Sequence, residues 1–163
     1  MPPPQIKTVE DVIYYYYAKL IIASAAQCVG QYGFIIDQYN QLKAGKRKMS
    51  DYDREIRKQM ESENKCVYCG NDSSVMDHVI PKAINAPDCA HNIVKSCQHC
   101  NSSKGDKDLI DWWVNHLKKD KDSLPRIPIG IYLKFSYDWH KINHTLGNPA
   151  RSLFDLKPFI VCK

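Results

Sequence analysis

The sequence lacks an uncharged apolar run long enough to cross a membrane, which argues against an integral membrane protein. Its most apolar stretch, Val12 to Val29, carries Lys19 near the middle and includes four tyrosines. The first five residues, Met1-Pro2-Pro3-Pro4-Gln5, lack the basic, apolar and small-residue segments of a secretory signal peptide. We therefore expect a soluble protein of the reducing cytoplasm, without a membrane partner.

Internal repeats, long low-complexity tracts and a large excess of one charge are also missing. The chain of 163 residues, with 44% hydrophobic and 25% charged residues, has the composition of an ordinary globular protein. Its net charge of +5 has the sign that suits a polyanionic partner, although solubility alone would explain so small an excess. The charge becomes evidence only together with a motif.

The cysteines form a pattern that indicates a metal site. There are seven, an odd number, and four of them form two Cys-x-x-Cys pairs. In a reducing compartment this spacing favours a closed, tetrahedral zinc site of the structural kind over disulfides. The proposed ligands are Cys66, Cys69, Cys97 and Cys100.

Other readings of the cysteines remain open. Cys89 and His91 could replace a ligand but lack the paired spacing, and the four cysteines could be buried without metal. We interpret His99, which lies between two proposed ligands, as a bystander. Cys28 and Cys162 are most simply buried or incidental thiols.

Three regions follow one another along the chain: residues 1–64, 65–118 and 119–163. In the first, a capping-box-like Thr8 and Asp11 begin a helix for which Gly30 is a plausible end. Further helices are expected at 34–43 and around 50–60. The middle region contains strand candidates at 75–80 and 93–95, and its pattern becomes helical from Cys100. The last region follows a proline-rich break at 124–128. It contains an amphipathic helix around 131–142, and a stop is expected at 147–149.

The middle region resembles a known family. The run Cys66-x-x-Cys69, Asp77-His78-Val79-Ile80-Pro81, Asn92 and Cys97-x-x-Cys100-Asn101-x-x-Lys104-Gly105 resembles the HNH endonuclease motif of the four-cysteine zinc subtype. The resemblance covers about a quarter of the chain. It implies an α+β, mostly helical protein in which a small ββα-metal module with a structural zinc is flanked by N-terminal and C-terminal helices.

The resemblance also implies roles for individual residues. His78 would be the general base, Asp77 and Asn101 would hold a catalytic divalent cation, and Asn92 would orient the loop and the histidine. These types suit the chemistry, because phosphodiester hydrolysis needs an activated water and a cation that stabilises charge on the phosphate. A carboxylate and a neutral oxygen ligand form a hard site for Mg²⁺ or Mn²⁺, between which the sequence does not choose.

Each residue has a plainer alternative. An adjacent Asp-His pair occurs by chance in many chains, Asn92 could be a turn residue, and Asn101 could cap the helix that begins near Cys100. Lys104, which we interpret as a phosphate contact, could be solvated surface, and Lys82 is a weaker phosphate candidate. The chain also departs from many family members, because residues 83–87 replace their paired glycine. That departure concerns substrate preference more than chemistry.

Two basic segments outside the motif are candidates for contacts with nucleic acid. The first contains Lys43, Lys46, Arg47 and Lys48, followed by Arg54, Arg57 and Lys58, and could follow a phosphate backbone or be a solvated helix face. The second mixes basic and aromatic side chains: Lys134, Tyr137, Trp139, His140, Lys141 and His144, of which Trp139 is expected in the core.

The tyrosine run at 14–17 covers a full helical turn, so its rings cannot all face one side of a helix. We favour a homodimer interface, because one such active site cuts one strand and two copies related by two-fold symmetry would cut both. The expected function is metal-dependent hydrolysis of DNA, with double-stranded DNA as the expected partner, in restriction or genome defence. A homing endonuclease, a Holliday-junction resolvase and a catalytically silent zinc module that binds nucleic acid are the alternatives.

Overall fold

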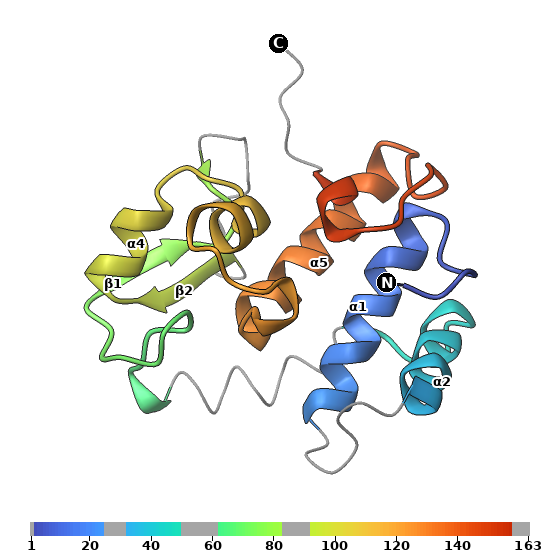
Figure 1. Cartoon of the computed structure of the whole chain (residues 1–163), viewed down its shortest axis with the longest axis horizontal. Coiled ribbons are helices and arrows are strands. Elements are labelled where there is room, and N and C mark those ends of the chain that lie inside the picture. The colour runs from blue at the N-terminus through green and yellow to red at the C-terminus, as the bar shows by residue number, and fades with distance from the viewer. Residues whose placement is uncertain (1, 25–31, 50–61, 83–91, 158–163) are drawn as a thin grey trace. The chain divides into compact units, whose positions relative to one another are not determined.

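The computed structural model describes residues 2–24, 32–49, 62–82 and 92–157. The chain forms two compact units (Figure 1): unit 1 comprises Met1–Arg54 and Leu133–Pro158, and unit 2 comprises Glu55–Tyr132 and Phe159–Lys163. The three regions expected along the sequence remain a prediction. Within the described residues, no helix combines the length and apolar character needed to cross a membrane.

Several expectations lie outside the described residues. They concern the stop at Gly30, the helix around 50–60 with its basic residues Arg54, Arg57 and Lys58, the loop 83–87, and the residues Cys28, Cys89, His91 and Cys162.

Unit 1 begins with helix α1, Val9–Ser24, whose predicted start is confirmed. The Thr8 hydroxyl accepts a hydrogen bond from the Asp11 amide at 3.2 Å, and the Asp11 carboxylate accepts one from the Thr8 amide at 3.2 Å. This reciprocal pair satisfies amides that a helix N-terminus leaves without intrahelical partners. The segment before Ala150 satisfies two more, because the amides of Val9 and Glu10 donate to the carbonyls of Asn148 and Leu146.

The tyrosine run of α1 packs inside unit 1. Tyr15, Tyr16 and Tyr17 are buried, and the Tyr17 hydroxyl donates to the carbonyl of Met49. Tyr14 is half-buried and packs against Tyr137, with the ring centroids 5.5 Å apart. Because this unit accounts for the burial of three rings, the run does not itself require a second subunit.

Helix α2, Tyr32–Lys43, confirms the second predicted helix and packs against α1. Lys43 forms ion pairs with Glu10 at 2.7 Å and with Asp11 at 2.9 Å. The Tyr39 hydroxyl donates to the Asp11 carboxylate at 2.9 Å. Lys43 therefore holds α2 on α1 and is not available as a contact to nucleic acid.

Asp11 makes the stability of unit 1 depend on pH. Burial by itself would raise the pKa of Asp11, but the Lys43 ion pair and hydrogen bonds from Lys7, Tyr39 and Thr8 outweigh it and lower the pKa to about 2, from 3.8. A carboxyl with a depressed folded pKa stabilises the fold fully above its unfolded pKa, and that contribution is lost as the pH falls from about 4 to about 2.

We expect Asp11→Asn to lower the free energy of unfolding by about 2 kcal/mol at pH 7. The deficit relative to wild type should shrink as the pH falls from 4 to 2, because the wild-type carboxyl becomes protonated. Urea unfolding of both proteins at each pH, followed by circular dichroism, measures this difference. Asp37→Asn makes the same change at an exposed position of α2, and a deficit independent of pH would contradict the assignment.

The C-terminal part of the chain forms helix α5, Arg126–Ile142, and the short 3-10 helix η5, Leu153–Leu156. Helix α5 begins earlier than expected. Pro128 lies in its first turn, where a missing amide hydrogen costs nothing because that hydrogen has no intrahelical acceptor. The helix also ends before the expected stop at 147–149, and Ile142, assigned to its apolar face, is 76% exposed.

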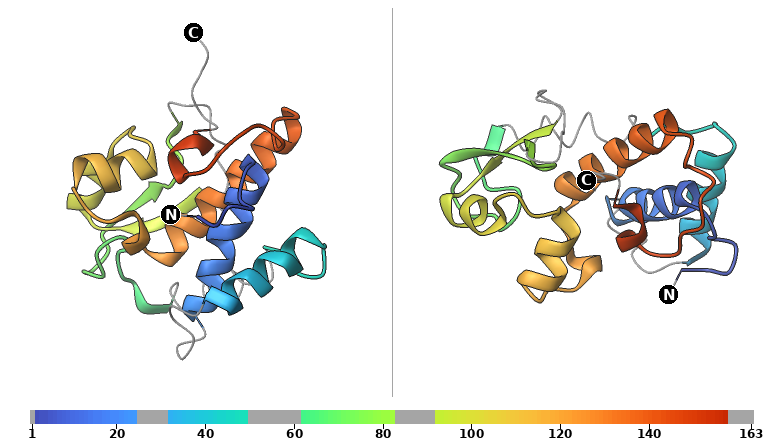
Figure 2. Two further views of the ribbon diagram at one scale, coloured as in Figure 1. Left: turned by 45° about the vertical axis from the view of Figure 1, so that its right-hand side comes forward. Right: turned by 90° about the horizontal axis from the view of Figure 1, so that it is seen from above.

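Unit 2 is built around the antiparallel pair β1, Val75–His78, and β2, Ile93–Ser96, with helix α4, Gln98–Lys104, against β1 (Figures 1 and 2). Asp77 pairs with Val94 and His78 with Ile93. The chain is mostly helical with one small sheet, so the expected α+β class with a ββα module is confirmed.

Strand β1 is shorter than the predicted run 75–80. The Val79 amide still donates to the Asn92 carbonyl at 3.0 Å, but the Asn92 side chain then takes the place of a backbone partner. Its carboxamide oxygen accepts from the Ile80 amide at 2.9 Å, and its nitrogen donates to the Ile80 carbonyl at 2.8 Å. Pro81 follows, and proline cannot donate to a ladder.

A helical segment that includes the π-turn Asp111–His116 completes the core of unit 2. Trp112 is fully buried and meets the Tyr68 ring edge-on, with the centroids 5.1 Å apart. Its indole N–H donates to the Ser103 hydroxyl of α4 at 3.0 Å. Aromatic burial on this scale holds the helical segment, the first cysteine pair and α4 together.

Candidate nuclease site and metal centre

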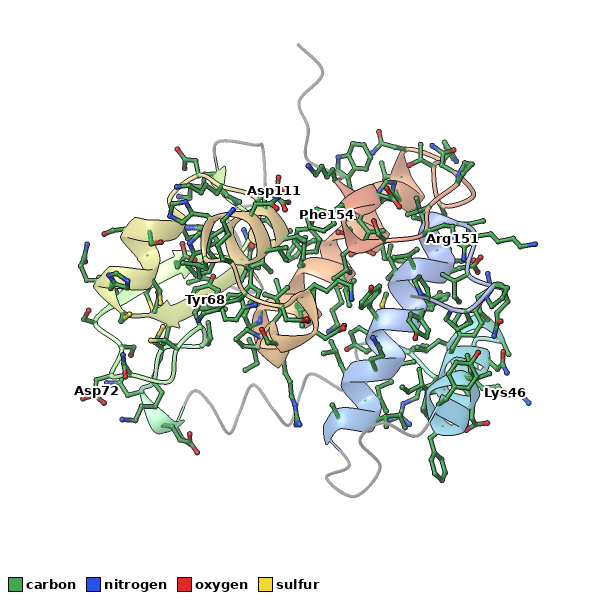
Figure 3. All side chains as sticks on the ribbon, viewed as in Figure 1. Lys46, Tyr68, Asp72, Asp111, Arg151 and Phe154 are labelled. Carbon is green, nitrogen blue, oxygen red and sulfur yellow. The ribbon has the colours of Figure 1, made fainter. Side chains whose placement is uncertain are left out.

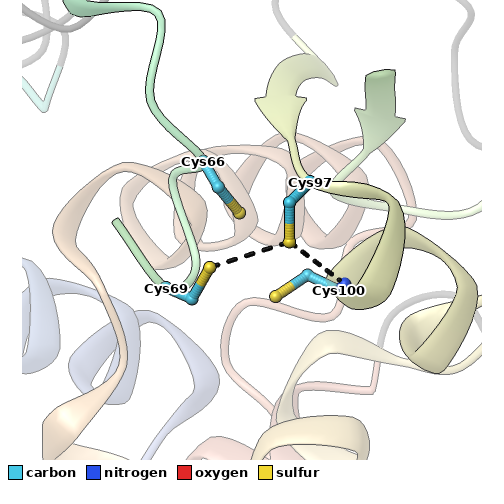
Figure 4. A group of neighbouring side chains, drawn as sticks. All are labelled: Cys66, Cys69, Cys97 and Cys100. Carbon is cyan, nitrogen blue, oxygen red and sulfur yellow. Dashed lines mark hydrogen bonds between the residues drawn. The ribbon is translucent and has the colours of Figure 1, made fainter. Parts of the chain in front are cut away.

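The four cysteine sulfurs converge in unit 2 (Figure 4). All of the sulfurs of Cys66, Cys69, Cys97 and Cys100 lie within 4.8 Å of one another, and those of Cys69 and Cys97 are 3.7 Å apart. Four sulfurs at about 2.3 Å from a zinc ion would be separated by about 3.8 Å in a tetrahedron. The four cysteines are therefore positioned to bind a metal ion, and zinc fits this donor set.

Two tight turns bring the sulfurs together. After Cys66 the chain turns back through Gly70, which has a φ of +77° and whose amide donates to the Cys66 carbonyl at 2.9 Å. At the other pair, Cys97 is the N-cap of α4, and its sulfur accepts from the Cys100 amide at 3.4 Å. Strand β2 leads directly into Cys97, so the sheet fixes where this turn begins.

The thiols cannot all ionise without a cation between them. Burial raises the pKa of Cys100, and the neighbouring cysteine sulfurs raise it further. Burial would also raise the pKa of Cys66, but backbone amides around its sulfur lower it to about 7. A bound dication would neutralise the crowded negative charge and deprotonate the thiols, as coordination by zinc does generally.

Asp77 lies in strand β1, where it pairs with Val94. The residue is only 6% exposed, and two groups contact the same carboxylate oxygen, Oδ2. The Tyr68 hydroxyl donates to it at 2.6 Å, and the Lys104 ammonium is 3.3 Å from it. Burial, with the Asp77 charge, raises the pKa of Tyr68 well above its usual value, so this hydroxyl stays a donor.

Lys104 is fully buried and donates to the His78 carbonyl at 2.6 Å. Burial lowers the pKa of Lys104, while the Asp77 charge acts in the opposite direction. Because the ammonium contacts protein groups on two sides, this placement favours a positioning role over the phosphate contact predicted from the sequence. Lys104 links the C-terminal end of α4 to the end of β1, where the histidine lies.

His78 is half-buried at the end of β1, and its backbone is held from two directions. Lys104 binds its carbonyl, and Asn92 holds the next two residues through the Val79 amide and the Ile80 backbone. Asn92 is 0% exposed and has its side chain committed to Ile80. The orienting role expected for Asn92 stays a prediction, and in the structure its side chain binds the backbone of Ile80, two residues after His78.

Asn101 and Lys82 complete the motif. Asn101 is half-buried within α4, one residue after Cys100, and the helix packs against β1. The alternative that Asn101 caps this helix is wrong, because Cys97 is the N-cap. Lys82 is exposed just beyond β1, where it is accessible to a ligand.

Sequence reasoning missed two residues of the site. Tyr68 lies between the first pair of cysteines and binds Asp77, and Figure 3 shows it among the packed side chains of unit 2. Ser96 is 0% exposed, with its hydroxyl 3.9 Å from the Cys66 sulfur. A hydroxyl-bearing ring inside a Cys-x-x-Cys turn was the signal for Tyr68. Ser96, the last residue of β2, gave no such signal.

The two basic candidate segments differ in how far their side chains are exposed in unit 1. Lys46 is exposed and projects outward (Figure 3), Arg47 donates to the Gln38 side chain at 2.9 Å, and Lys48 is exposed. In the second segment, His140 is buried, with its ring nitrogens 2.7 Å from the Thr145 hydroxyl and 2.8 Å from the Leu156 carbonyl. His140 is therefore a structural residue.

Comparison with known families agrees with this geometry. Residues 66–107 match the model of the family described as HNH endonuclease. The match covers about a quarter of the chain and contains both cysteine pairs, the Asp77-His78 pair, Asn92, Asn101 and Lys104. This segment therefore matches an HNH endonuclease domain at the residues that form the candidate site. No curated protein and no solved structure matches the chain.

Proposed function

We propose that this protein is a metal-dependent DNA endonuclease with a structural zinc and one catalytic Mg²⁺ or Mn²⁺. The observation that carries the proposal is the joint placement of three elements. Strand β1 carries Asp77 and His78, α4 carries Asn101 and packs on that strand, and the cysteine cluster fixes the start of α4.

The side chains divide the work of hydrolysis. Both contacts to the Asp77 carboxylate fall on Oδ2, so Oδ1 is the oxygen that we assign to the cation, together with the Asn101 side-chain oxygen. A bound cation would supply charge stabilisation at the phosphate and the leaving oxygen. His78 takes the proton of the attacking water, whose oxygen bonds to phosphorus while the bond to the 3′ oxygen breaks, and the leaving 3′ oxygen takes a proton from a solvent water. The products are 5′-phosphate and 3′-hydroxyl ends.

One contact favours a second candidate, a silent zinc module that binds nucleic acid. The Lys104 ammonium lies 3.3 Å from the Asp77 carboxylate and already compensates its charge. A catalytic cation bound to the same carboxylate would be repelled by this nearby positive charge, whereas a module without catalysis would hold no cation there. Dependence on added divalent metal distinguishes the two candidates.

The direct test is incubation of purified protein with supercoiled plasmid. We expect nicked and linear DNA with added Mg²⁺ or Mn²⁺ and none without, because His78 cannot position and activate water alone. Sequencing the ends should find 5′-phosphates. Binding without cleavage at any metal concentration would favour the silent module.

The biological role is proposed on the same basis. A restriction or genome-defence nuclease should give discrete fragments, because recognition residues outside the module would select sites. A homing endonuclease would cut one long site, and a resolvase would prefer branched DNA. Two-strand cutting at one place would support a homodimer.

A further inference from the structure

Unit 1 contains a solvent-open cavity of about 490 Å³ that the nuclease module does not explain. It brings together residues from α1, from the end of α2 and the chain after it, and from α5. The lining comprises four basic side chains, two tyrosines, one carboxylate and three other residues: Arg47, Lys48, Lys134, Lys141, Tyr14, Tyr137, Asp138, Leu42, Gly45 and Met49.

The cavity joins the two basic segments that the sequence suggested separately. Lys134 and Lys141 are seven residues apart on α5, two helical turns, so they share a face with Tyr137 between them. Arg47 and Lys48 come from the chain that follows α2. Residues about 90 positions apart in sequence therefore face the same space.

The charge of the lining selects the ligand. Four cations outnumber the single carboxylate of Asp138, so the cavity favours an anion. The Arg47 guanidinium is partly bound by Gln38, but its Nε is buried and has no hydrogen-bond partner among the described residues. A buried N–H without a partner is costly, and a shift of the side chain that brought Nε to an anionic oxygen would satisfy it.

The tyrosines add hydroxyl groups to this lining. Burial raises the pKa of Tyr14, and its hydrogen bond with Tyr137 raises it further, so the hydroxyl stays protonated. Arginine, lysine and tyrosine are the side chains that commonly contact phosphate oxygens. Leu42 and Met49 contribute the aliphatic and thioether side chains of the lining.

We propose that this cavity binds a phosphate group of the nucleic-acid backbone, making unit 1 a substrate-anchoring surface separate from the nuclease module. The inference rests on the proposed function for the identity of the polymer. Of the second basic segment it keeps Lys134, Tyr137 and Lys141 as contacts and leaves out Trp139, His140 and His144, and it adds Tyr14.

The test is the binding of a fluorescein-labelled 20-base-pair DNA by fluorescence anisotropy, without added divalent cation and at several salt concentrations. The pair Lys134→Gln/Lys141→Gln should weaken binding about tenfold or more and reduce the slope of log K against log salt by about two. Lys134→Arg/Lys141→Arg should restore both. Lys7→Gln/Arg151→Gln makes the same charge change at exposed residues of unit 1 outside the cavity and should have little effect.

Binding and plasmid cleavage are measured on the same preparations, so the two proposals fail separately. The cavity pair is Lys134→Gln/Lys141→Gln, and the control pair is Lys7→Gln/Arg151→Gln. If both double variants weaken DNA binding equally, the cavity assignment is overturned, whether or not the plasmid is cut. Loss of binding only in the cavity pair would support it, even for a protein that never cleaves. A different result would identify a free-nucleotide site and overturn the proposal. In that case a mononucleotide would stabilise the protein as much as the duplex does, and the double variant Lys134→Gln/Lys141→Gln would bind the duplex as well as wild type does.

Discussion

Cys100→Ser should remove the zinc from the protein and unfold unit 2. Metal analysis of the wild type should find about one zinc per chain, and the variant should retain almost none. Binding of structural zinc contributes about 10–16 kcal/mol to small zinc modules, against a typical domain stability of about 5–15 kcal/mol. Losing a ligand of a four-sulfur site therefore removes free energy comparable to the whole stability of this unit.

Two tryptophans report on the unit that is expected to unfold. Trp112 and Trp113 are 0% and 3% exposed, and both lie in unit 2. Their emission should shift to longer wavelength in Cys100→Ser and in wild type treated with a strong chelator. Restoring zinc should reverse the shift only in the wild type, because the variant lacks the fourth sulfur.

Other cysteines provide the controls. Cys28→Ser makes the same change at a cysteine that is not one of the four proposed ligands and should keep the zinc. Cys89→Ser examines the ligand that the sequence left as an alternative, and it should also keep the zinc, because the four clustered sulfurs already complete a tetrahedral set. Full zinc content in Cys100→Ser would contradict the ligand assignment.

The predictable part of this site was the part encoded by spacing along the chain. Two Cys-x-x-Cys turns each bring two sulfurs together locally, so Cys66 and Cys97 could be recognised as members of one metal centre from their pattern alone. Strand β1, which carries Asp77, and strand β2, which begins just after Asn92, could also be predicted, because β-branched residues occur in both runs. The start of α1 could be found from its capping pair.

What the sequence could not show depends on contacts between distant residues. Lys104 was interpreted as a phosphate contact, because only tertiary packing places its ammonium beside Asp77 and the His78 carbonyl. Tyr68 drew no attention, because its role is a hydrogen bond across the fold. The start of α5 was misjudged because Pro128 was interpreted as a break, whereas a first-turn proline is compatible with a helix.

His78→Ala should lower the rate of plasmid nicking by about 10² to 10⁴-fold, the usual contribution of a positioned general base. The fold should survive, because two backbone contacts of this residue are kept in the variant: Lys104 binds its carbonyl, and the strand pairs it with Ile93. Zinc content and the melting temperature should therefore remain close to those of wild type. Binding of duplex DNA without added divalent metal should also be unchanged.

His116→Ala is the matched control, since it removes an exposed imidazole from the same unit and should leave the nicking rate unchanged. Imidazole added to the buffer should restore part of the activity of His78→Ala, because a free base can occupy the space left by the ring. Added imidazole should not restore the activity of Asp77→Ala, because that variant lacks the proposed metal ligand. This difference separates a proton acceptor from a merely structural histidine. Nicking by His78→Ala at the wild-type rate would remove the general base from the mechanism and leave the nuclease assignment without its central residue.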